Sequence, residues 1–451
     1  MLNVHLRISD DIGKPTPVRL RLSAEGGAQF PPLGRAAEFA SGRAEDVGAQ
    51  LKLGRERWWH IDGACEIPLP AGAPLRVQAT KGPVWEPLSE SVTLGAGQIS
   101  LRFALRRACN TEGWVSVDTR AHFVPPHAAL LEARAEGLDV ANVLAVPLNV
   151  LALDANTYTT VPNLLAFSGQ VPAVEAAGAQ VVVNTFNVHP VLGKLALLNS
   201  HRPVFPLAFG GPEDTDDWGL CDWCDQCHRK KGVVVWCDAF EPAGGNAGGE
   251  ALVAAVLGKI DAVEVTDAPR KAPLLPWVYR LWDAGVRVPL VGASAKDSNR
   301  TPLGAMRTWV KPDGGTWLDC VRTGCTVASA WPLLTLTRDG DSFRARGFPE
   351  PVEVELLSNG QVVASGAGAV EAEVSAPGWV AARTAGGPFA HTSPVWVGEP
   401  ARDPRAVQAL LRLVQQTVEW AREHGHYANP KRRAALLERC AEARAKLEAP
   451  A

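Results

Sequence analysis

The alternation of short apolar runs with helical stretches between residues 109 and 312 is the feature that most constrains the fold. Mostly apolar runs occur at Val140–Val146, Val181–Val183 and Val233–Trp236. Buried parallel strands have this composition, because helices cover both faces of a parallel sheet. Helical patterns, such as Pro125–Gly137 and Glu250–Leu257, lie between the runs. The alternation therefore predicts an α/β unit with parallel strands, of the kind that forms a (β/α) barrel.

Residues 1–108 have a different pattern, in which apolar and charged side chains alternate. Val4–Ile8 and Val18–Leu22 show this two-residue period, which is typical of half-buried strands. Turns rich in Gly and Pro, such as Pro70-Ala71-Gly72, separate the segments. We expect a small β-sandwich here.

The chain after residue 312 divides into a β-rich part, 313–400, and a helical pair, 401–451. Pro351–Leu357, Asn359-Gly360 and Gln361–Val363 together form a strong hairpin signal. The first helix is predicted to bury one apolar face, and the second to begin after Asn429-Pro430. The predicted apolar face consists of Val407, Leu410, Leu411, Val414 and Val418.

Composition excludes several classes of protein. Hydrophobic residues make up 46% of the 451 residues, enough for a sizeable core, and the net charge of −3 argues against general nucleic-acid or membrane-surface binding. Residues 1–14 contain no apolar run, and no run approaches the ~20 residues that span a bilayer. Nine cysteines, three of them at 221–227, indicate reduced thiols rather than a disulfide framework. We therefore expect a cytoplasmic protein without nucleic-acid or membrane partners.

The segment Gly113–Phe123 reads as an apolar strand that runs into a polar cluster, Asp118-Thr119-Arg120-Ala121-His122. Barrel enzymes carry active-site groups at such strand ends. The segment resembles the first motif of the PHP (polymerase and histidinol phosphatase) metallohydrolases, most closely the CehA/McbA-type branch. Cys227–Trp236, Gly258–Glu264 and Pro302–Thr308 extend the resemblance, which covers roughly residues 1–447.

This resemblance implies a distorted (β/α)7 barrel at 109–312, preceded by a carboxypeptidase-regulatory-like sandwich and followed by a β-rich and helical extension. It also implies hydrolysis of amide, carbamate or ester bonds by a metal-activated water.

Most positions that hold metal ligands in this family are substituted here. By the resemblance, Arg120 replaces a His, Phe186 a Glu, Lys194 a His and Ala295 an Asp, and of these motifs His122 alone is kept. Arg cannot deprotonate and Lys rarely does, so neither ligates a divalent metal well. The chain is therefore predicted to be a degenerate PHP-like hydrolase, a pseudoenzyme without a cofactor that acts in binding or assembly.

The substitutions leave two hypotheses for the predicted pocket. The pocket either binds a small anionic ligand, or its charges neutralise one another, with a buried Arg120 paired to Asp118 or Asp238. The predicted pocket residues are Arg120, His122, Phe186, Lys194, Asp238, Ala295 and Lys296.

Two alternative functions remain open. One is a working hydrolase that holds Zn, Mn or Fe through other ligands, such as His122, Asp238, Asp297, His189 or the thiols. The other is a structural subunit of an active paralogue, and a homo-oligomer is also compatible with the sequence.

Two further motifs have competing interpretations. Cys224, Cys227, His228 and Cys237 have spacings that can hold zinc, but on the helix expected at 218–231 these thiols are more typical of core packing. The glycine-rich segment Glu241–Gly249 precedes a helix, where backbone amides can bind phosphate. A βα loop at the active face is the favoured interpretation of this segment.

Overall fold

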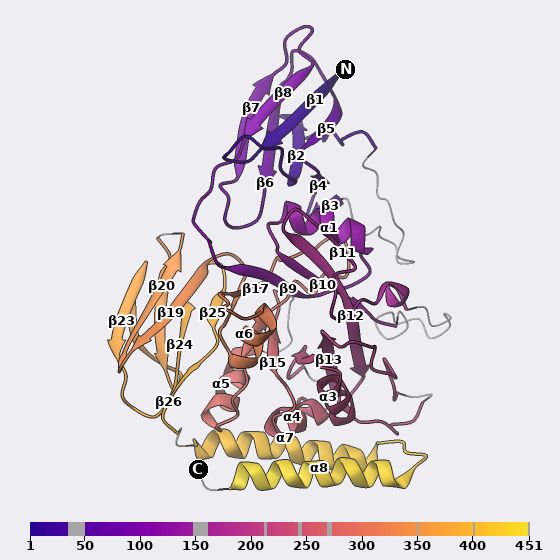
Figure 1. The fold of residues 1–451 in the computed structure, drawn as a ribbon, viewed down its shortest axis with the longest axis vertical. Coiled ribbons are helices and arrows are strands. Elements are labelled where there is room, and N and C mark those ends of the chain that lie inside the picture. The colour runs from indigo at the N-terminus through magenta and orange to yellow at the C-terminus, as the bar shows by residue number, and fades with distance from the viewer. Residues whose placement is uncertain are drawn as a thin grey trace.

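The computed structural model describes residues 1–34, 50–147, 161–211, 214–241, 246–267, 273–349, 351–399 and 402–449. These residues form a mixed α/β structure. Strands β1–β8 lie at one end, helices α7 and α8 lie at the opposite end, and a mixed α/β region and a C-terminal β region lie between them (Figure 1).

The N-terminal region consists of two sheets with the strand orders β5-β1-β8 and β3-β4-β2-β6-β7. In β1, Val4, Leu6 and Ile8 are buried, while Asn3 and His5 face outward between them. The alternation predicted from the sequence therefore forms two sheets around one core. The strands are β1 Leu2–Ser9, β2 Val18–Ala24, β3 Gln50–Leu53, β4 Glu56–Ile61, β5 Ala64–Leu69, β6 Pro74–Thr80, β7 Leu88–Thr93 and β8 Ser100–Ala104.

The central sheet begins with strands and helices close to those predicted. Strands β9, β10 and β12 are parallel, and helix α1 connects β9 to β10. Strands β14, β15 and β16 are also parallel, with α4 and α5 between them. These elements are β9 Val115–Ala121, α1 Pro126–Ala135, β10 Val140–Ala145, β12 Ala179–His189, β14 Val233–Cys237, α4 Gly249–Val256, β15 Ala262–Val265, α5 Leu275–Asp283 and β16 Leu290–Gly292.

The expectation of parallel strands between residues 109 and 312 is wrong for β11 (Val174–Ala176), β13 (Gly193–Leu198) and β17 (Arg307–Val310), each of which runs antiparallel to a neighbour. Strand β13 runs antiparallel to both β12 and β14. The chain reverses after His189, whose Nδ1 accepts hydrogen bonds from the backbone N–H groups of Val191 (3.1 Å) and Leu192 (2.9 Å). This side-chain acceptor satisfies the donors of a tight turn, and β13 therefore returns beside β12.

The hydrogen-bonded ladder continues from β9 through β17 and β18 into the C-terminal strands. It runs as one 15-stranded sheet from β16 at one end to β22 at the other, so no closed barrel appears as a continuous ladder in the described part of the chain. The strands of this part are β17 Arg307–Val310, β18 Thr326–Ser329, β21 Glu353–Ser358, β22 Gln361–Ala367, β24 Gly378–Thr384, β25 Ala390–Thr392 and β26 Val395–Val397. Strands β19 Leu333–Asp339, β20 Ser342–Phe348 and β23 Ala369–Glu373 form a separate sheet.

The predicted hairpin and helical pair are both present. Strands β21 and β22 are joined by Asn359 and Gly360, which have φ angles of 48° and 78°, as a tight hairpin turn requires. Helix α7, Pro404–Glu423, buries Leu410, Leu413 and Val414 against α4 and α5, and α8, Pro430–Glu448, packs beside it. No helix among the described residues is long and apolar enough to cross a membrane.

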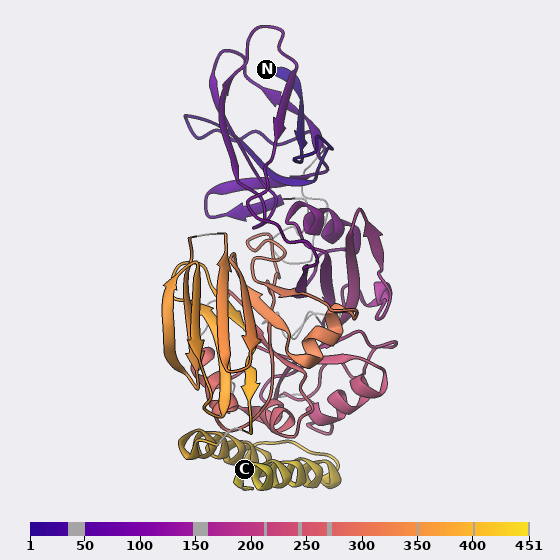
Figure 2. The same ribbon diagram turned by 60° about the vertical axis from the view of Figure 1, so that its left-hand side comes forward.

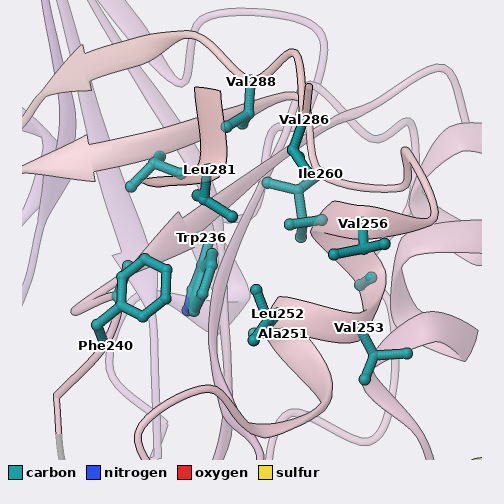
Figure 3. Packing of buried hydrophobic residues seen from close by; sticks show 14 of the residues in the cluster. Trp236, Phe240, Ala251, Leu252, Val253, Val256, Ile260, Leu281, Val286 and Val288 are labelled. Carbon is teal, nitrogen blue, oxygen red and sulfur yellow. The ribbon is translucent and has the colours of Figure 1, made fainter. Parts of the chain in front are cut away.

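A large apolar cluster fixes the end of β14, where the candidate site begins. Trp236 and Phe240 pack with ring centroids 4.7 Å apart, and Leu252 of α4 and Leu281 of α5 belong to the same cluster (Figure 3). Asp238 lies between these two aromatic residues in the sequence, so their packing fixes the backbone that carries its carboxylate.

Candidate functional site

Arg120 lies at the centre of the candidate site, near the carboxyl end of β9. Its buried guanidinium donates from Nε to Glu264 Oε2 (2.8 Å) and from Nη2 to Glu264 Oε1 (2.6 Å). Nη2 also donates to Asp238 Oδ1 at 2.8 Å. Strand β15 supplies Glu264, and the residue after β14 supplies Asp238. The guanidinium therefore holds one carboxylate bidentately and bridges it to a second.

Asp238 links this buried pair to the surface. Its Oδ2 accepts a hydrogen bond from Lys194 Nζ of β13 at 2.8 Å, and the Lys194 side chain is 32% exposed. Burial would raise the pKa of Asp238, but the positive charges of Arg120 and Lys194 outweigh it and hold this pKa well below its usual value. Burial raises the pKa of Glu264, and Arg120 opposes that shift.

These residues do not fit a divalent metal ion. Two cations and two carboxylates form a formally neutral cluster, and the cations already bond to the oxygens that a metal would need. Arg120 cannot lose its proton to become a ligand. Within the described ranges, no group of three or more His, Cys, Asp and Glu side chains could hold a metal.

The other predicted ligands lie apart from this cluster. His122 is buried against Phe186, with ring centroids 5.0 Å apart, and the Phe186 ring also lies 5.2 Å from the Arg120 guanidinium carbon. Asp297 is exposed, and Ala295 has a φ of 51° in the loop after β16.

Lys296 forms a second, separate ion pair. Its fully buried Nζ lies 3.2 Å from Glu132 Oε1 of α1, and it donates to the carbonyls of Ser298 (3.1 Å) and Thr301 (2.8 Å). The predicted pocket therefore divides into two charge-balanced groups, one around Arg120 and one around Lys296.

Asp118 has a structural role rather than the ion pair with Arg120 that the sequence allowed. Its carboxylate accepts backbone N–H bonds from Arg120 (3.2 Å), Ser294 (3.0 Å) and Gly304 (2.8 Å). Burial raises the pKa of Asp118, and these hydrogen bonds oppose that shift. Asp118 thus fastens β9 to the segments on either side of residue 300.

Sequence reasoning missed Glu264 and Glu132 as partners. Each is a carboxylate within an apolar stretch, in Val263-Glu264-Val265 and in Leu130-Leu131-Glu132-Ala133. A fully buried carboxylate needs a cation or several donors, so this pattern was the signal that could have identified both.

A pocket of about 160 Å³ opens beside the Lys194–Asp238 pair. Trp236 and Phe240 form its apolar wall, and Glu241 adds a second carboxylate. Asn246 also lines the pocket, and its buried Nδ2 has no hydrogen-bond partner among the described residues. Of the predicted glycine-rich loop, residues 242–245 lie outside the described residues.

His189 lines the same pocket, but both of its ring nitrogens are engaged. Nε2 lies 2.8 Å from Asp216 Oδ1, and Nδ1 accepts the two N–H bonds of the β12–β13 turn. His189 therefore holds the turn and is not available as a ligand.

The thiols of helix α3, Leu220–Arg229, are core residues. Cys221, Cys224 and Cys227 are buried, and burial raises the pKa of Cys227 to about 12. Burial also raises the pKa of Cys237 on β14. His228 Nε2 bonds to Asp261 at 2.8 Å. Cys227 Sγ lies 3.2 Å from Ser200 Oγ and 3.7 Å from the Val233 carbonyl oxygen, and the described residues contain no group of three or more His, Cys, Asp and Glu side chains arranged for the zinc site considered from the sequence.

The comparisons with known proteins identify no family. No protein-family model matches the chain, and no curated protein matches it. Among solved structures, the chain is similar to the crystal structure of PsfC from Pseudomonas syringae PB-5123, at 14% identity and a TM-score of 0.29. This match covers 45% of this chain and 84% of that one. A likeness of this size carries no argument about fold or function.

Proposed function

We propose that this chain is a degenerate PHP-like hydrolase scaffold that acts in ligand binding or assembly and not in catalysis. The Gly113–Phe123 motif and the strand–helix order from β9 to β16 support the proposal. The proposed ancestral barrel is distorted and incompletely closed. A single parallel bridge between Ala121 and Lys296 joins the segment after β16 to β9. This bridge supports a barrel that, among the described residues, is closed at one point and not by a full strand pairing.

One observation carries the proposal: the Arg120 guanidinium is bonded to both Asp238 and Glu264. The buried Glu264 and the part-buried Asp238 require positive charge, which a metal ion supplies in a metallohydrolase. Here a permanent side-chain cation supplies it, with Lys194 as a second donor to Asp238. A charge that cannot deprotonate stabilises this arrangement and leaves no oxygen pair free to activate a water.

The pocket beside Lys194 is the proposed ligand site. It holds one cation and two carboxylates, because Asp238 and Glu241 both lie beside Lys194. A simple anion would meet two carboxylates there. A small polar ligand that offers an acceptor to Asn246 Nδ2 and a donor to these carboxylates fits better.

Elemental mass spectrometry of the purified, untagged protein tests the proposal, with His122→Ala and Cys227→Ser measured beside the wild type. We expect far less than one equivalent of Zn, Mn or Fe in all three proteins. We also expect no hydrolysis of amide, carbamate or ester substrates when these metals are added. About one equivalent, lost in His122→Ala, together with metal-dependent hydrolysis, would overturn the proposal. Loss only in Cys227→Ser would reveal a thiolate site and refute the metal-free interpretation.

A further inference from the structure

A second and larger pocket, of about 390 Å³, lies between the N-terminal sandwich and the central sheet. Its walls come from the β1–β2 turn, the segments after β6 and β8, the end of α1 and the β11–β12 turn (β11 is Val174–Ala176). Figures 1 and 2 show this junction, where the sandwich meets α1. Ser116 and Asp139 place the pocket at the amino-terminal ends of β9 and β10, away from Arg120.

Lys81 is the cation that gives this pocket its chemistry. Its Nζ donates to the carbonyls of Pro17 (3.0 Å) and Arg134 (2.7 Å), and within the described chain it forms no ion pair with a carboxylate. An ammonium can donate three hydrogen bonds, so one donor is left for a ligand. A partly buried positive charge that is bonded only to neutral oxygens favours an anion.

The remaining charges of the pocket do not satisfy Lys81. Arg107 and Arg134 line the pocket but are paired outside it, with Asp11 at 2.9 Å and Asp62 at 3.2 Å respectively. The two carboxylates that line the pocket accept hydrogen bonds from their own segments. Asp139 accepts from the backbone and the hydroxyl of Ser116, and Asp10 accepts from the backbone of Ile12 and Lys14.

Aromatic side chains form the apolar part of the wall. Trp85, Trp114 and Trp309 line the pocket, and Arg107 lies over the Trp85 ring at 4.5 Å. Trp309 is 3% exposed, and its Nε1–H has no hydrogen-bond partner among the residues the structure describes. A buried indole N–H normally bonds to an acceptor, and this donor is an observation independent of Lys81.

We propose that this junction pocket binds a small organic anion, a carboxylate or phosphate attached to a planar ring. Lys81 Nζ supplies a donor to the anionic group of the ligand, and the tryptophans that line the pocket pack against the ring. The volume lies within the range of small-molecule sites.

The acid–base state of Lys81 agrees with this assignment. Burial and the charges of Arg134 and Arg107 together lower the pKa of Lys81 to about 8, against an opposing effect of Asp10 and Glu136. A bound anion favours the charged form, so binding near pH 8 should take up protons. Affinity should therefore fall as the pH rises above 8.

Isothermal titration calorimetry with benzoate, phenyl phosphate and inorganic phosphate tests the proposal, and benzyl alcohol serves as the neutral control. We expect benzoate or phenyl phosphate to bind at least tenfold more tightly than benzyl alcohol, with proton uptake at pH 8. Comparison of benzoate with phenyl phosphate shows whether the pocket prefers a carboxylate or a phosphate. Comparison of phenyl phosphate with inorganic phosphate measures the contribution of the ring to affinity.

Two variants and a matched control make the test decisive. Lys81→Gln should weaken binding roughly tenfold or more and abolish the proton uptake, because a hydrogen bond to a charged group is lost. Ala177→Asp adds a negative charge at the exposed rim without touching the bonds of Lys81, and should weaken binding similarly. Lys52→Gln, on an exposed strand position outside the pocket, should bind as the wild type does.

Failure of all three anions to bind at millimolar concentration would overturn the proposal. Unchanged affinity in folded Ala177→Asp would also overturn it, even if Lys81→Gln proved unstable.

Discussion

Arg120 is a permanent charge whose burial is tolerated only because two carboxylates bond to it. Arg120→Ala should lower the free energy of unfolding by about 3–5 kcal/mol, because Glu264 and Asp238 would lose their shared cation in a buried site. Urea denaturation at pH 7 measures the change, since urea carries no charge. Added methylguanidinium should restore part of the lost stability by occupying the vacated site.

Lys194→Met is the matched control for that experiment. Lys194 bonds to the same Asp238, but its side chain is 32% exposed, so solvent screens the pair. We expect a loss below about 1 kcal/mol. Equal losses in the two variants would contradict the view that Arg120 is the central cation of the cluster.

At this scale the sequence predicted part of the cluster. The pairing of Arg120 with Asp238 was one of its expectations, because a buried guanidinium needs an acid and Asp238 follows a strand. Glu264 was missed, because its partner lies 144 residues away and only the strand order brings them together. Lys296 was placed in the same pocket, but Glu132 of α1 draws it into another ion pair.

Strand β25 and helix α5 are joined through a buried histidine that should make stability depend on pH. His391 Nε2 accepts a hydrogen bond from Tyr279 Oη at 2.7 Å, and Nδ1 donates to the Thr392 carbonyl at 2.7 Å. Burial lowers the pKa of His391 to about 4 from an ordinary 6.5. The unfolded chain therefore binds this proton first, so the contribution is complete above pH 6.5 and is lost as the pH falls toward 4.

His391→Gln isolates this contribution. Between pH 7 and pH 5 the wild type should lose about 2 kcal/mol more stability than the variant, as two-state linkage gives for this pKa difference. Urea denaturation of both proteins at the two pH values measures the difference. Parallel stability curves would show that His391 titrates normally and that its burial has no effect on its pKa.

The β12–β13 hairpin depends on Gly193, which has a φ of 135°. A Cβ at this position would lie 2.7 Å from the Ala251 Cβ and 3.0 Å from Leu220 Cδ2. Gly193→Ala should therefore lower the free energy of unfolding by about 2 kcal/mol or more, because backbone strain at this φ and the collision of the new Cβ act together. Gly72→Ala is the control, since Gly72 also has a positive φ, 73°, but an added Cβ would meet no other atom. This variant should lose only the free energy that corresponds to backbone strain. Thermal unfolding compares them, and equal effects would exclude the collision.

Elements were predicted better than their directions. The apolar runs located β10, β12 and β14, and helical periodicity located α1, α4 and α7 within a few residues. Periodicity contains no information on strand direction, so the reversal into β13 was not anticipated. That reversal is determined by hydrogen bonds from Val191 and Leu192 to a single side chain, His189.

Across the whole molecule, the sheet crosses the boundaries that the sequence pattern drew. Strand β17 lies near the end of the predicted α/β unit and pairs with β9, and β18 continues the ladder into the β-rich extension. Local sequence patterns predict single strands and helices. The pairing of strands that are distant in the sequence depends on register and packing, which a local pattern does not describe. Whether these regions unfold together is therefore tested best by a reporter group that is present in several of them.

The cysteines are such reporter groups, because nine free thiols differ in burial. Cys325 is exposed, Cys65 and Cys109 are intermediate, and the others are buried. An accessible thiolate attacks a disulfide reagent, and burial raises the pKa of Cys227 to about 12, so core thiols should react only after unfolding.

With 5,5′-dithiobis(2-nitrobenzoate) at pH 7.5, we expect one thiol to react rapidly in the native protein, and this rapid reaction should be absent in Cys325→Ser. All nine should react in urea, with the buried ones appearing in a single transition. Rapid native labelling of α3, located by mass spectrometry of its peptide, would show that this helix opens independently. In that case the central core would not unfold as one cooperative unit.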